Sequence, residues 1–284
     1  WLKNLLVLAA PVMAGEIGSP EVLVAVALAF VAFCAAASAI YLLNDVLDAE
    51  ADRAHPLKRH RPVASGRLRP AVALAVSAAL AVFALGVASL ANLDLVWVVA
   101  AYLALSVGYC LWFKTEPVLD IAVIAVGFLL RAVAGGAAAG IALSQWFLLA
   151  ASFGSLFMAA GKRYAEVVAL RPGEAAAPGK AAYTTTYLRF IWTLAAGVLI
   201  MTYGLWAFEV SSGYAGSTAG GSPSAVHRRL PAIISIAPFV LAVLRYGHAI
   251  DAGLAGEPEE IAWRDRVLQS LALAWLVLVV LAVY

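Results

Sequence analysis

The sequence predicts an all-α, polytopic membrane protein built as a bundle of about nine transmembrane helices. Of its 284 residues, 64% are hydrophobic and only 13% are charged, whereas soluble globular domains carry about 25% charged residues. The mean hydropathy is +0.93. The apolar residues form continuous runs of roughly 20, which is the length of a helix that crosses a bilayer. Continuous runs also exclude the alternating strands of a membrane β-barrel.

Nine such runs follow one another along the chain, and we expect each to form a helix within a single transmembrane domain over 1–284. The first run is short and is interrupted at Gly15. Because the chain starts at Trp1 rather than Met, we expect a preceding stretch to be missing. In chain order the runs are 3–14, 22–43, 70–91, 95–113, 118–139, 143–161, 188–209, 230–248 and 266–284.

The distribution of basic residues predicts the orientation in the membrane. Of the 19 Lys and Arg residues, all but Arg131, Arg228 and Arg229 fall on one predicted side, which includes Arg171 and Lys180. The positive-inside rule makes this side cytoplasmic. We therefore expect a multi-pass protein of the inner cell membrane, with its active site at the cytoplasmic face. The loops on that side are 44–69, 114–117, 162–187 and 249–265.

An acidic cluster follows the run 22–43. Asp45, Asp48 and Asp52 share one stripe of a continuing helix, and Asn44 lies beside Asp48. Carboxylates are unfavourable at a helix C-terminus, so this cluster needs a counterion. Mg²⁺ prefers oxygen ligands and typically binds one or two carboxylates together with substrate phosphates. The cluster therefore predicts a magnesium site, and the alternative is a solvated helix end with scattered arginine pairs.

Basic residues follow the acidic cluster directly. Lys58, Arg59 and Arg61 lie in the next loop, where they could merely enforce topology. Lysine and arginine donate charge-assisted hydrogen bonds to phosphate, so their position beside a metal site favours phosphate binding. His55 and His60 are interpreted as polar loop residues.

These residues resemble the UbiA-type intramembrane prenyltransferase superfamily. Its members are nine-helix bundles with the motif Asn-Asp-x-x-Asp-x-x-x-Asp on the second helix, which here is Asn44, Asp45, Asp48 and Asp52. The resemblance implies that all three aspartates are catalytic and that Asp45 and Asp48 bind Mg²⁺. Asp52 either binds the metal as a third ligand or supports the other two. It extends over nearly the whole chain, through Trp1 to Asn4, Arg61-Pro62 with Gly66, Tyr109 to Lys114 with Asp120, and Arg131 with Gly135-Gly136.

The second motif departs from the superfamily pattern. Typical members carry Asp-x-x-x-Asp after the sixth helix, whereas this chain has Gly-Lys-Arg-Tyr-Ala-Glu over 161–166. The segments 155–159 and 183–192 around it look like one branch in particular, the decaprenyl-phosphate phosphoribosyltransferases. This implies transfer of 5-phosphoribose from 5-phosphoribosyl 1-diphosphate to a polyprenyl phosphate, with release of diphosphate, for cell-wall arabinan (arabinogalactan) synthesis.

The resemblance also implies roles for the remaining candidate residues. Lys162 and Glu166 are expected to be catalytic. Lys162, Arg163 and Lys58 would neutralise donor phosphates, while Tyr164 and Glu166 would hold ribose hydroxyls. An ion pair between Lys162 and Glu166 is the alternative. The expected substrate-binding residues are Lys3, Asn44, Lys58, Arg61, Lys114, Asp120, Arg131, Arg163 and Tyr164.

Arg131 lies within an apolar run, so we expect it to face the bundle interior. A structural pairing and contact with a substrate phosphate both remain open for it.

Gly136 and Gly140 are interpreted as sites of close helix packing. We expect membrane lipids and the two substrates as partners, and no nucleic acid. The small-residue helix faces are compatible with a homo-oligomer of undefined size.

Other functions are less compatible with the sequence. A conventional prenyltransferase would move a prenyl group from its diphosphate to an aromatic acceptor, but the segment 162–166 lacks the paired acids. A transporter or lipid-binding protein would typically have charged or broken helices at the membrane centre, where this chain has only Arg131 as a basic residue.

Overall fold

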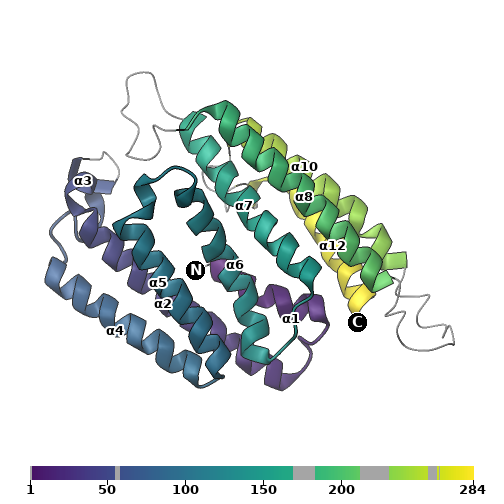
Figure 1. Ribbon diagram of the computed structural model, residues 1–284, viewed down its shortest axis with the longest axis horizontal. Coiled ribbons are helices and arrows are strands. Elements are labelled where there is room, and N and C mark those ends of the chain that lie inside the picture. The colour runs from purple at the N-terminus through teal and green to yellow at the C-terminus, as the bar shows by residue number, and fades with distance from the viewer. Residues whose placement is uncertain (1, 55–57, 169–182, 212–229, 255–260, 262) are drawn as a thin grey trace. The chain divides into compact units, whose positions relative to one another are not determined.

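The computed structural model describes residues 2–54, 58–168, 183–211, 230–254, 261 and 263–284 (Figure 1). Trp1, His55, Arg171, Lys180, Arg228 and Arg229 lie outside these residues, as does most of the loop 210–229. The described part of the chain is helical and contains no strand. Seven of its helices are long and apolar enough to cross a membrane, namely Pro20–Leu47, Pro70–Ser89, Leu93–Leu111, Leu119–Ala139, Thr185–Ser211, Leu230–Asp251 and Arg266–Val283.

The other two predicted spans are helical as well. Run 3–14 forms the 3₁₀ helix η1 (Leu2–Leu8) and α1 (Ala9–Ala14), which together make a shorter apolar helix. Run 143–161 forms, from Gln145 onward, the first part of α7 (Gln145–Val168), a 24-residue helix that also carries the charged side chains at 162, 163 and 166. The prediction of a helical membrane bundle is confirmed, with nine as an approximate count.

The chain forms two compact units. Unit 1 contains residues 1–11, 17–114 and 130–142, and unit 2 contains 12–16, 115–129 and 143–284. The division passes through α6 (Leu119–Ala139). The prediction of a single domain over 1–284 stays a prediction.

Unit 1 is built on α2 (Pro20–Leu47), which packs along α4 (Pro70–Ser89) and α5 (Leu93–Leu111) (Figure 1). Prolines at the first turns of α2 and α4 suit their start, because proline lacks a donor that would be unpaired there. Alanines such as Ala32 and Ala36 are fully buried around Phe33. Small residues let membrane helices approach closely, so α2 can pack against several neighbours.

Gly135 within α6 and Gly140 directly after it have different roles. A Cβ at Gly135 would overlap the carbonyl oxygen of Val7 in η1, so this glycine permits the backbones of η1 and α6 to touch. Gly140 has a φ of +67° and nothing within 4 Å of an added Cβ. Its conformation ends α6, which is the usual role of glycine at a helix C-terminus. The packing role expected at Gly140 is therefore wrong, and Gly135 has it instead.

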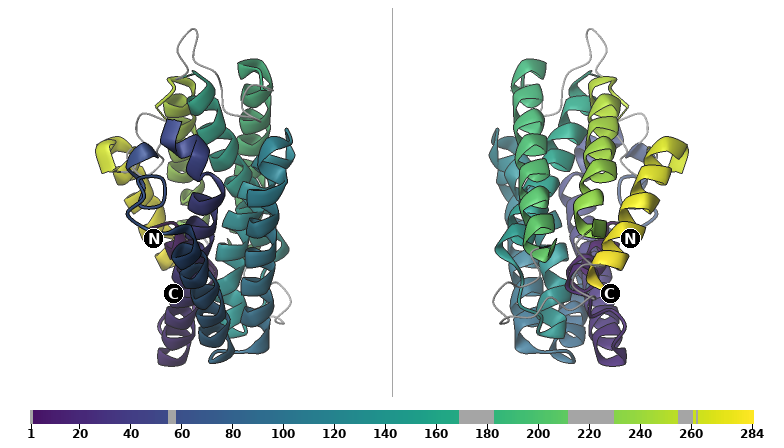
Figure 2. Two further views of the ribbon diagram at one scale, coloured as in Figure 1. Left: turned by 90° about the vertical axis from the view of Figure 1, so that its left-hand side faces the viewer. Right: turned by 90° about the vertical axis from the view of Figure 1, so that its right-hand side faces the viewer.

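Unit 2 contains α7, α8 (Thr185–Ser211), α10 (Ile236–Asp251) and α12 (Arg266–Val283). The helix α7 packs along α8, and α10 lies between α8 and α12 (Figure 2). A polar network crosses these helices: the Tyr203 hydroxyl lies 2.7 Å from the Ser235 hydroxyl and accepts a hydrogen bond from Trp275 Nε1 at 2.7 Å. Buried polar groups need such partners, so the network fixes how α8, α10 and α12 are packed.

Candidate active site

The acidic cluster lies at a break between two helices of unit 1. The helix α2 ends at Leu47, Asp48 has φ −94° and ψ 3°, and α3 (Ala49–Ala54) follows. The predicted uninterrupted helix is therefore wrong. Hydrogen bonds of helical spacing still cross the break, because the Asp48 N–H donates to the Asn44 carbonyl and the Asp52 N–H donates to the Asp48 carbonyl, both at 2.8 Å.

Arg61 joins two of the three aspartates. Its Nη1 atom lies 3.0 Å from Asp45 Oδ1 and 2.9 Å from Asp52 Oδ2. The Asp52 side chain is only 5% exposed, so its charge requires a close partner. A single nitrogen bonded by both carboxylates means that they converge on one point of positive charge.

Asp48 has different partners. Lys114 Nζ lies 2.5 Å from Asp48 Oδ1, and Asn44 Nδ2 donates to Asp48 Oδ2 at 3.0 Å. Lys114 lies in the 3₁₀ helix η3 (Phe113–Thr115), directly after α5. The position of the three aspartates on one stripe suggested a common set of partners. In the structure, however, Asp48 has partners that differ from those of Asp45 and Asp52. Each is neutralised by a cation from elsewhere in unit 1, which resembles the arginine-paired alternative.

The loop that supplies Arg61 is held against α3. Val63 is 1% exposed and packs with Ala49, and Arg53 Nε donates to the Ala64 carbonyl at 3.2 Å. Gly66 has a φ of +77°, a conformation that glycine adopts without strain. These contacts fix the backbone that carries Arg61. Lys58 in η2 (Lys58–His60) is exposed on the same loop.

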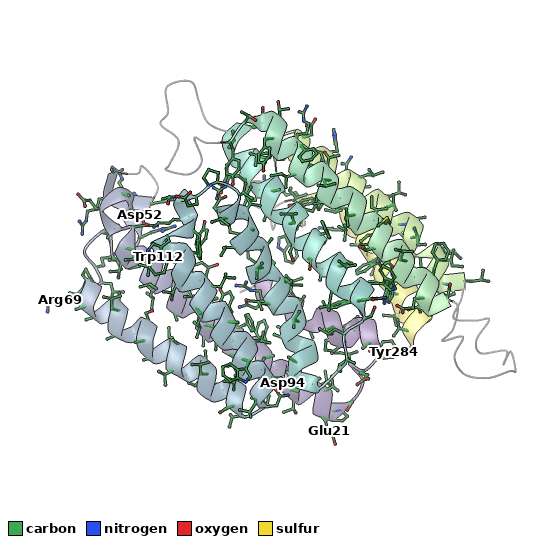
Figure 3. The ribbon with its side chains drawn as sticks, in the orientation of Figure 1. Glu21, Asp52, Arg69, Asp94, Trp112 and Tyr284 are labelled. Carbon is green, nitrogen blue, oxygen red and sulfur yellow. The ribbon has the colours of Figure 1, made fainter. Side chains whose placement is uncertain are left out.

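The cluster lies at the end of unit 1 where basic residues gather. Figure 3 shows Asp52, Arg69 and Trp112 toward one end of this unit and Glu21 and Asp94 toward the opposite end. Lys58 and Arg61 come from the same loop region as Arg69. The site therefore combines acidic and basic groups at one end of the helices.

The donor set fits a hard cation such as Mg²⁺. Carboxylate oxygens of Asp45 and Asp52 already approach one cationic nitrogen, and Mg²⁺ needs few carboxylates when phosphate oxygens complete its coordination. Within the described ranges, no group of three or more His, Cys, Asp or Glu side chains is arranged to hold a metal by itself.

Arg131 lies in a second polar site of unit 1. Its guanidinium donates to Asn4 Oδ1 at 2.8 Å and to the Tyr102 hydroxyl at 2.9 Å. It also lies over the Tyr102 ring, 4.7 Å from the centroid, and the residue is 7% exposed. Arg131 thus faces inward, as predicted. Lys3, next to Asn4, is half-buried.

Unit 2 contains a buried ion-pair network. Arg163 on α7 donates to Asp120 Oδ2 at 2.5 Å and to Glu166 Oε2 at 2.9 Å. Asp120 is 1% exposed and also accepts a hydrogen bond from the Tyr183 hydroxyl. Glu166 thus bonds Arg163 three positions before it. Sequence reasoning identified Asp120, Arg163 and Glu166 but not Tyr183, which it noted only as part of a segment.

Tyr164 and Lys162 flank Arg163 on α7. Tyr164 is 3% exposed, and its hydroxyl accepts a hydrogen bond from Arg189 at 2.9 Å and donates to Asp251 at 3.3 Å. Lys162 is half-buried. The tyrosine therefore links α7 to α8 and α10.

Comparison with known proteins gives one consistent result. The sequence pattern of the UbiA prenyltransferase family matches residues 5–252. The decaprenyl-phosphate phosphoribosyltransferase of Corynebacterium glutamicum is 50% identical over 289 residues, which cover 100% of this chain and 84% of that protein. The enzyme of the same name from Mycolicibacterium smegmatis is 48% identical, covering 100% of this chain and 89% of that protein. The one from Mycobacterium tuberculosis is 49% identical, covering 100% of this chain and 91% of that protein.

Solved structures share the fold. A UbiA homolog from Archaeoglobus fulgidus bound to GPP and Mg²⁺ superposes with a TM-score of 0.66 at 14% identity, covering 99% of this chain and 98% of that one. The apo structure of a UbiA homolog from Aeropyrum pernix K1 gives a TM-score of 0.62 at 15% identity, covering 98% and 93%. At these identities the likeness concerns the fold alone.

Proposed function

The chain belongs to the UbiA prenyltransferase family, and we propose that it transfers 5-phosphoribose from 5-phosphoribosyl 1-diphosphate to decaprenyl phosphate and releases diphosphate. The observation that carries this proposal is the full-length likeness to three decaprenyl-phosphate phosphoribosyltransferases. The chain is a multi-pass membrane protein. The proposed product is a precursor of cell-wall arabinan.

The acidic cluster is proposed to bind the donor's diphosphate. Asp45, Asp48 and Asp52 would hold Mg²⁺, which supplies positive charge to the leaving diphosphate when it is bound. Arg61 and Lys114 bond these carboxylates. Both cations can also donate to phosphate oxygens, so they are proposed to bind the donor at the same end of unit 1. Lys58, exposed on the same loop, would add to this charge.

The reaction needs little acid–base chemistry. An oxygen of the polyprenyl phosphate attacks the anomeric carbon of the ribose, a C–O bond forms, and the bond to diphosphate breaks as diphosphate leaves with the electron pair. Attack opposite to the leaving group inverts the anomeric carbon. A phosphate is already ionised, so no general base is required. The contribution of the protein is positioning and charge stabilisation.

In unit 2, Lys162 is proposed to neutralise donor phosphate and Glu166 to accept hydrogen bonds from ribose hydroxyls. Arg163 and Tyr164 are proposed to support these two residues, because Arg163 bonds Asp120 and Glu166 and Tyr164 bonds Arg189 and Asp251. The site is proposed to lie at the cytoplasmic face, because the positive-inside rule makes the predicted side with most of the basic residues cytoplasmic.

Isotope transfer separates this proposal from conventional prenyl transfer. Purified protein in detergent is given decaprenyl phosphate and 5-phosphoribosyl 1-diphosphate labelled in the ribose, with and without Mg²⁺. We expect label in the organic-solvent phase only when both Mg²⁺ and decaprenyl phosphate are present. A parallel reaction supplies a labelled prenyl diphosphate and 4-hydroxybenzoate. Label in the aromatic product together with none in the phosphoribosyl lipid would overturn the proposal.

A further inference from the structure

The backbone at the start of α6 has an unfavourable conformation. Val118 has a φ of +71°, the only positive value for a non-glycine residue in the part of the chain that the structure describes. A β-branched side chain is rarely found in the left-handed region, because it clashes with its own backbone. Such conformations persist where surrounding contacts hold them, and they cluster at functional sites.

One hydroxyl group holds this turn. The Val118 N–H donates to the Tyr183 hydroxyl oxygen, and the same hydroxyl donates to Asp120 Oδ1. Tyr183 is 6% exposed, and its ring stacks on Tyr187 with the centroids 6.1 Å apart. The hydroxyl thus both accepts and donates, and it connects the segment before α8 to the start of α6.

The contact continues from Asp120 into α7. Asp120 Oδ2 accepts from Arg163 at 2.5 Å, and Arg163 also bonds Glu166. Asp120 and Arg163 have side chains that are 1% and 8% exposed, so little water competes with these bonds. A chain of hydrogen bonds therefore runs from Tyr183 to the carboxylate of Glu166.

We infer that Tyr183 is a positioning residue for the proposed phosphoribosyl transfer: its hydroxyl orients Asp120, which orients Arg163 and with it the segment 162–166 of α7. The inference rests on the proposed function, because that segment is proposed to contact the donor. Burial, followed by the hydrogen bond to Asp120, raises the pKa of Tyr183 above its ordinary value. The phenol therefore stays protonated at neutral pH and remains a donor.

The test removes the hydroxyl and keeps the ring. In Tyr183→Phe we expect the donor KM to rise about tenfold, the scale of one lost hydrogen bond, while the KM for decaprenyl phosphate changes less than about twofold. The control is Tyr187→Phe, which removes a hydroxyl from the stacked and more exposed ring and should leave both constants unchanged. An unchanged donor KM in Tyr183→Phe would overturn the inference.

A second variant separates positioning from stability. Val118→Gly removes the unfavourable side chain, so the double variant Tyr183→Phe/Val118→Gly should recover most of any Tm lost by Tyr183→Phe alone. It should not recover the donor KM, because Asp120 still lacks the hydrogen bond from the Tyr183 hydroxyl. If the donor KM recovers together with Tm, Tyr183 acts only on stability and the inference is wrong.

The two proposals fail in different ways. If the wild-type protein transfers no label from 5-phosphoribosyl 1-diphosphate, the proposed function fails and the inference fails with it. If the wild type is active and Tyr183→Phe retains the wild-type donor KM, only the inference fails. Should Tyr183→Phe not fold, the comparison is made between Val118→Gly and the double variant, where the same rise in donor KM is expected.

Discussion

Lys114 Nζ lies 2.5 Å from Asp48 Oδ1, so a cation in η3 neutralises a carboxylate at the break between α2 and α3. Both side chains are about one-third exposed, at 29% and 30%. The pair therefore lies in partial contact with water, where charges are screened. Lys114 can exchange Asp48 for a phosphate oxygen at small cost, which suits a residue that is proposed to bind the donor.

The first prediction concerns metal binding without substrate. Lys114→Met removes the cation that competes for Asp48, and we expect the affinity for Mn²⁺, used as a probe for Mg²⁺, to rise about three- to fivefold. This corresponds to roughly 1 kcal/mol or less for a partly exposed ion pair. The donor KM should rise at the same time. Electron paramagnetic resonance measures the free Mn²⁺.

Arg69→Met is the matched control, because it removes one exposed positive charge from the same end of unit 1. It should leave the Mn²⁺ affinity within about 1.5-fold, given the screening of exposed charges. An equal rise in both variants would mean that net charge alone is responsible. Weaker Mn²⁺ binding in Lys114→Met would contradict the predicted competition.

The second prediction concerns the buried pair in unit 2. Arg163→Met leaves Asp120 buried without its cation, and removing one partner of a buried ion pair typically costs about 3–5 kcal/mol. We expect a large loss of Tm in detergent. The double variant Arg163→Met/Asp120→Asn should recover a large part of it, because no unpaired buried charge remains. A normal Tm combined with a raised donor KM in Arg163→Met would instead assign Arg163 to the donor phosphate.

The third prediction concerns the contact between η1 and α6. Gly135→Ala places a Cβ against the Val7 carbonyl oxygen, so the two backbones must separate. Overpacking of this kind typically costs about 1–3 kcal/mol, and we expect a lower Tm. Gly86→Ala in α4 is the control, because nothing lies within 4 Å of its added Cβ. Alanine is the better helix former there, so that variant should match or exceed the wild-type Tm.

The fourth prediction concerns pH. Asp265 caps α12 by accepting from the N–H groups of Val267 and Leu268, and it pairs with Arg245 Nε at 2.7 Å. The hydrogen bond from Arg245 and those from the backbone lower the pKa of Asp265 below its usual 3.8. A lowered pKa in the folded protein stabilises it above the unfolded pKa, and this stability is lost as the pH falls from about 3.8 through the folded pKa.

Asp265→Asn keeps a side-chain oxygen that can cap α12, but it replaces the carboxyl group with an amide that does not titrate. Its Tm should therefore fall less steeply than that of the wild type as the pH decreases below about 4, while both proteins respond alike between pH 6 and 8. Thermal unfolding across this pH series provides the measurement. If the Tm values of the two proteins fell in parallel at low pH, the lowered pKa of Asp265 would not contribute to stability.

The helices could be predicted from the sequence because each is a long apolar run, and the acidic cluster because its residues are close in sequence. The break at Asp48 could not be predicted, since the intervals between Asp45, Asp48 and Asp52 are those of an intact helix. The pairing of Asp48 with Lys114 joins residues 66 positions apart. Spacing along one helix contains no information about such a contact.

The network around Tyr183 was harder to predict. The left-handed conformation of Val118 opposes the intrinsic preference of valine, so local sequence argues against it. The Tyr183 hydroxyl reaches Asp120 from 63 positions away. The two carboxylate partners of Arg163 could not be predicted from its place in the segment 161–166, because Asp120 is far away in sequence. The expected contact of Arg163 with a donor phosphate stays a prediction.

The most direct test of the account is the initial rate of diphosphate release from 5-phosphoribosyl 1-diphosphate, measured with and without decaprenyl phosphate. We expect release by the wild type only when the lipid is present, and a loss of at least about a hundredfold in Asp45→Asn. Glu50→Gln, an equivalent change at an exposed residue of α3, should keep the wild-type rate. Lipid-dependent release that persists at the wild-type rate in Asp45→Asn would contradict the account.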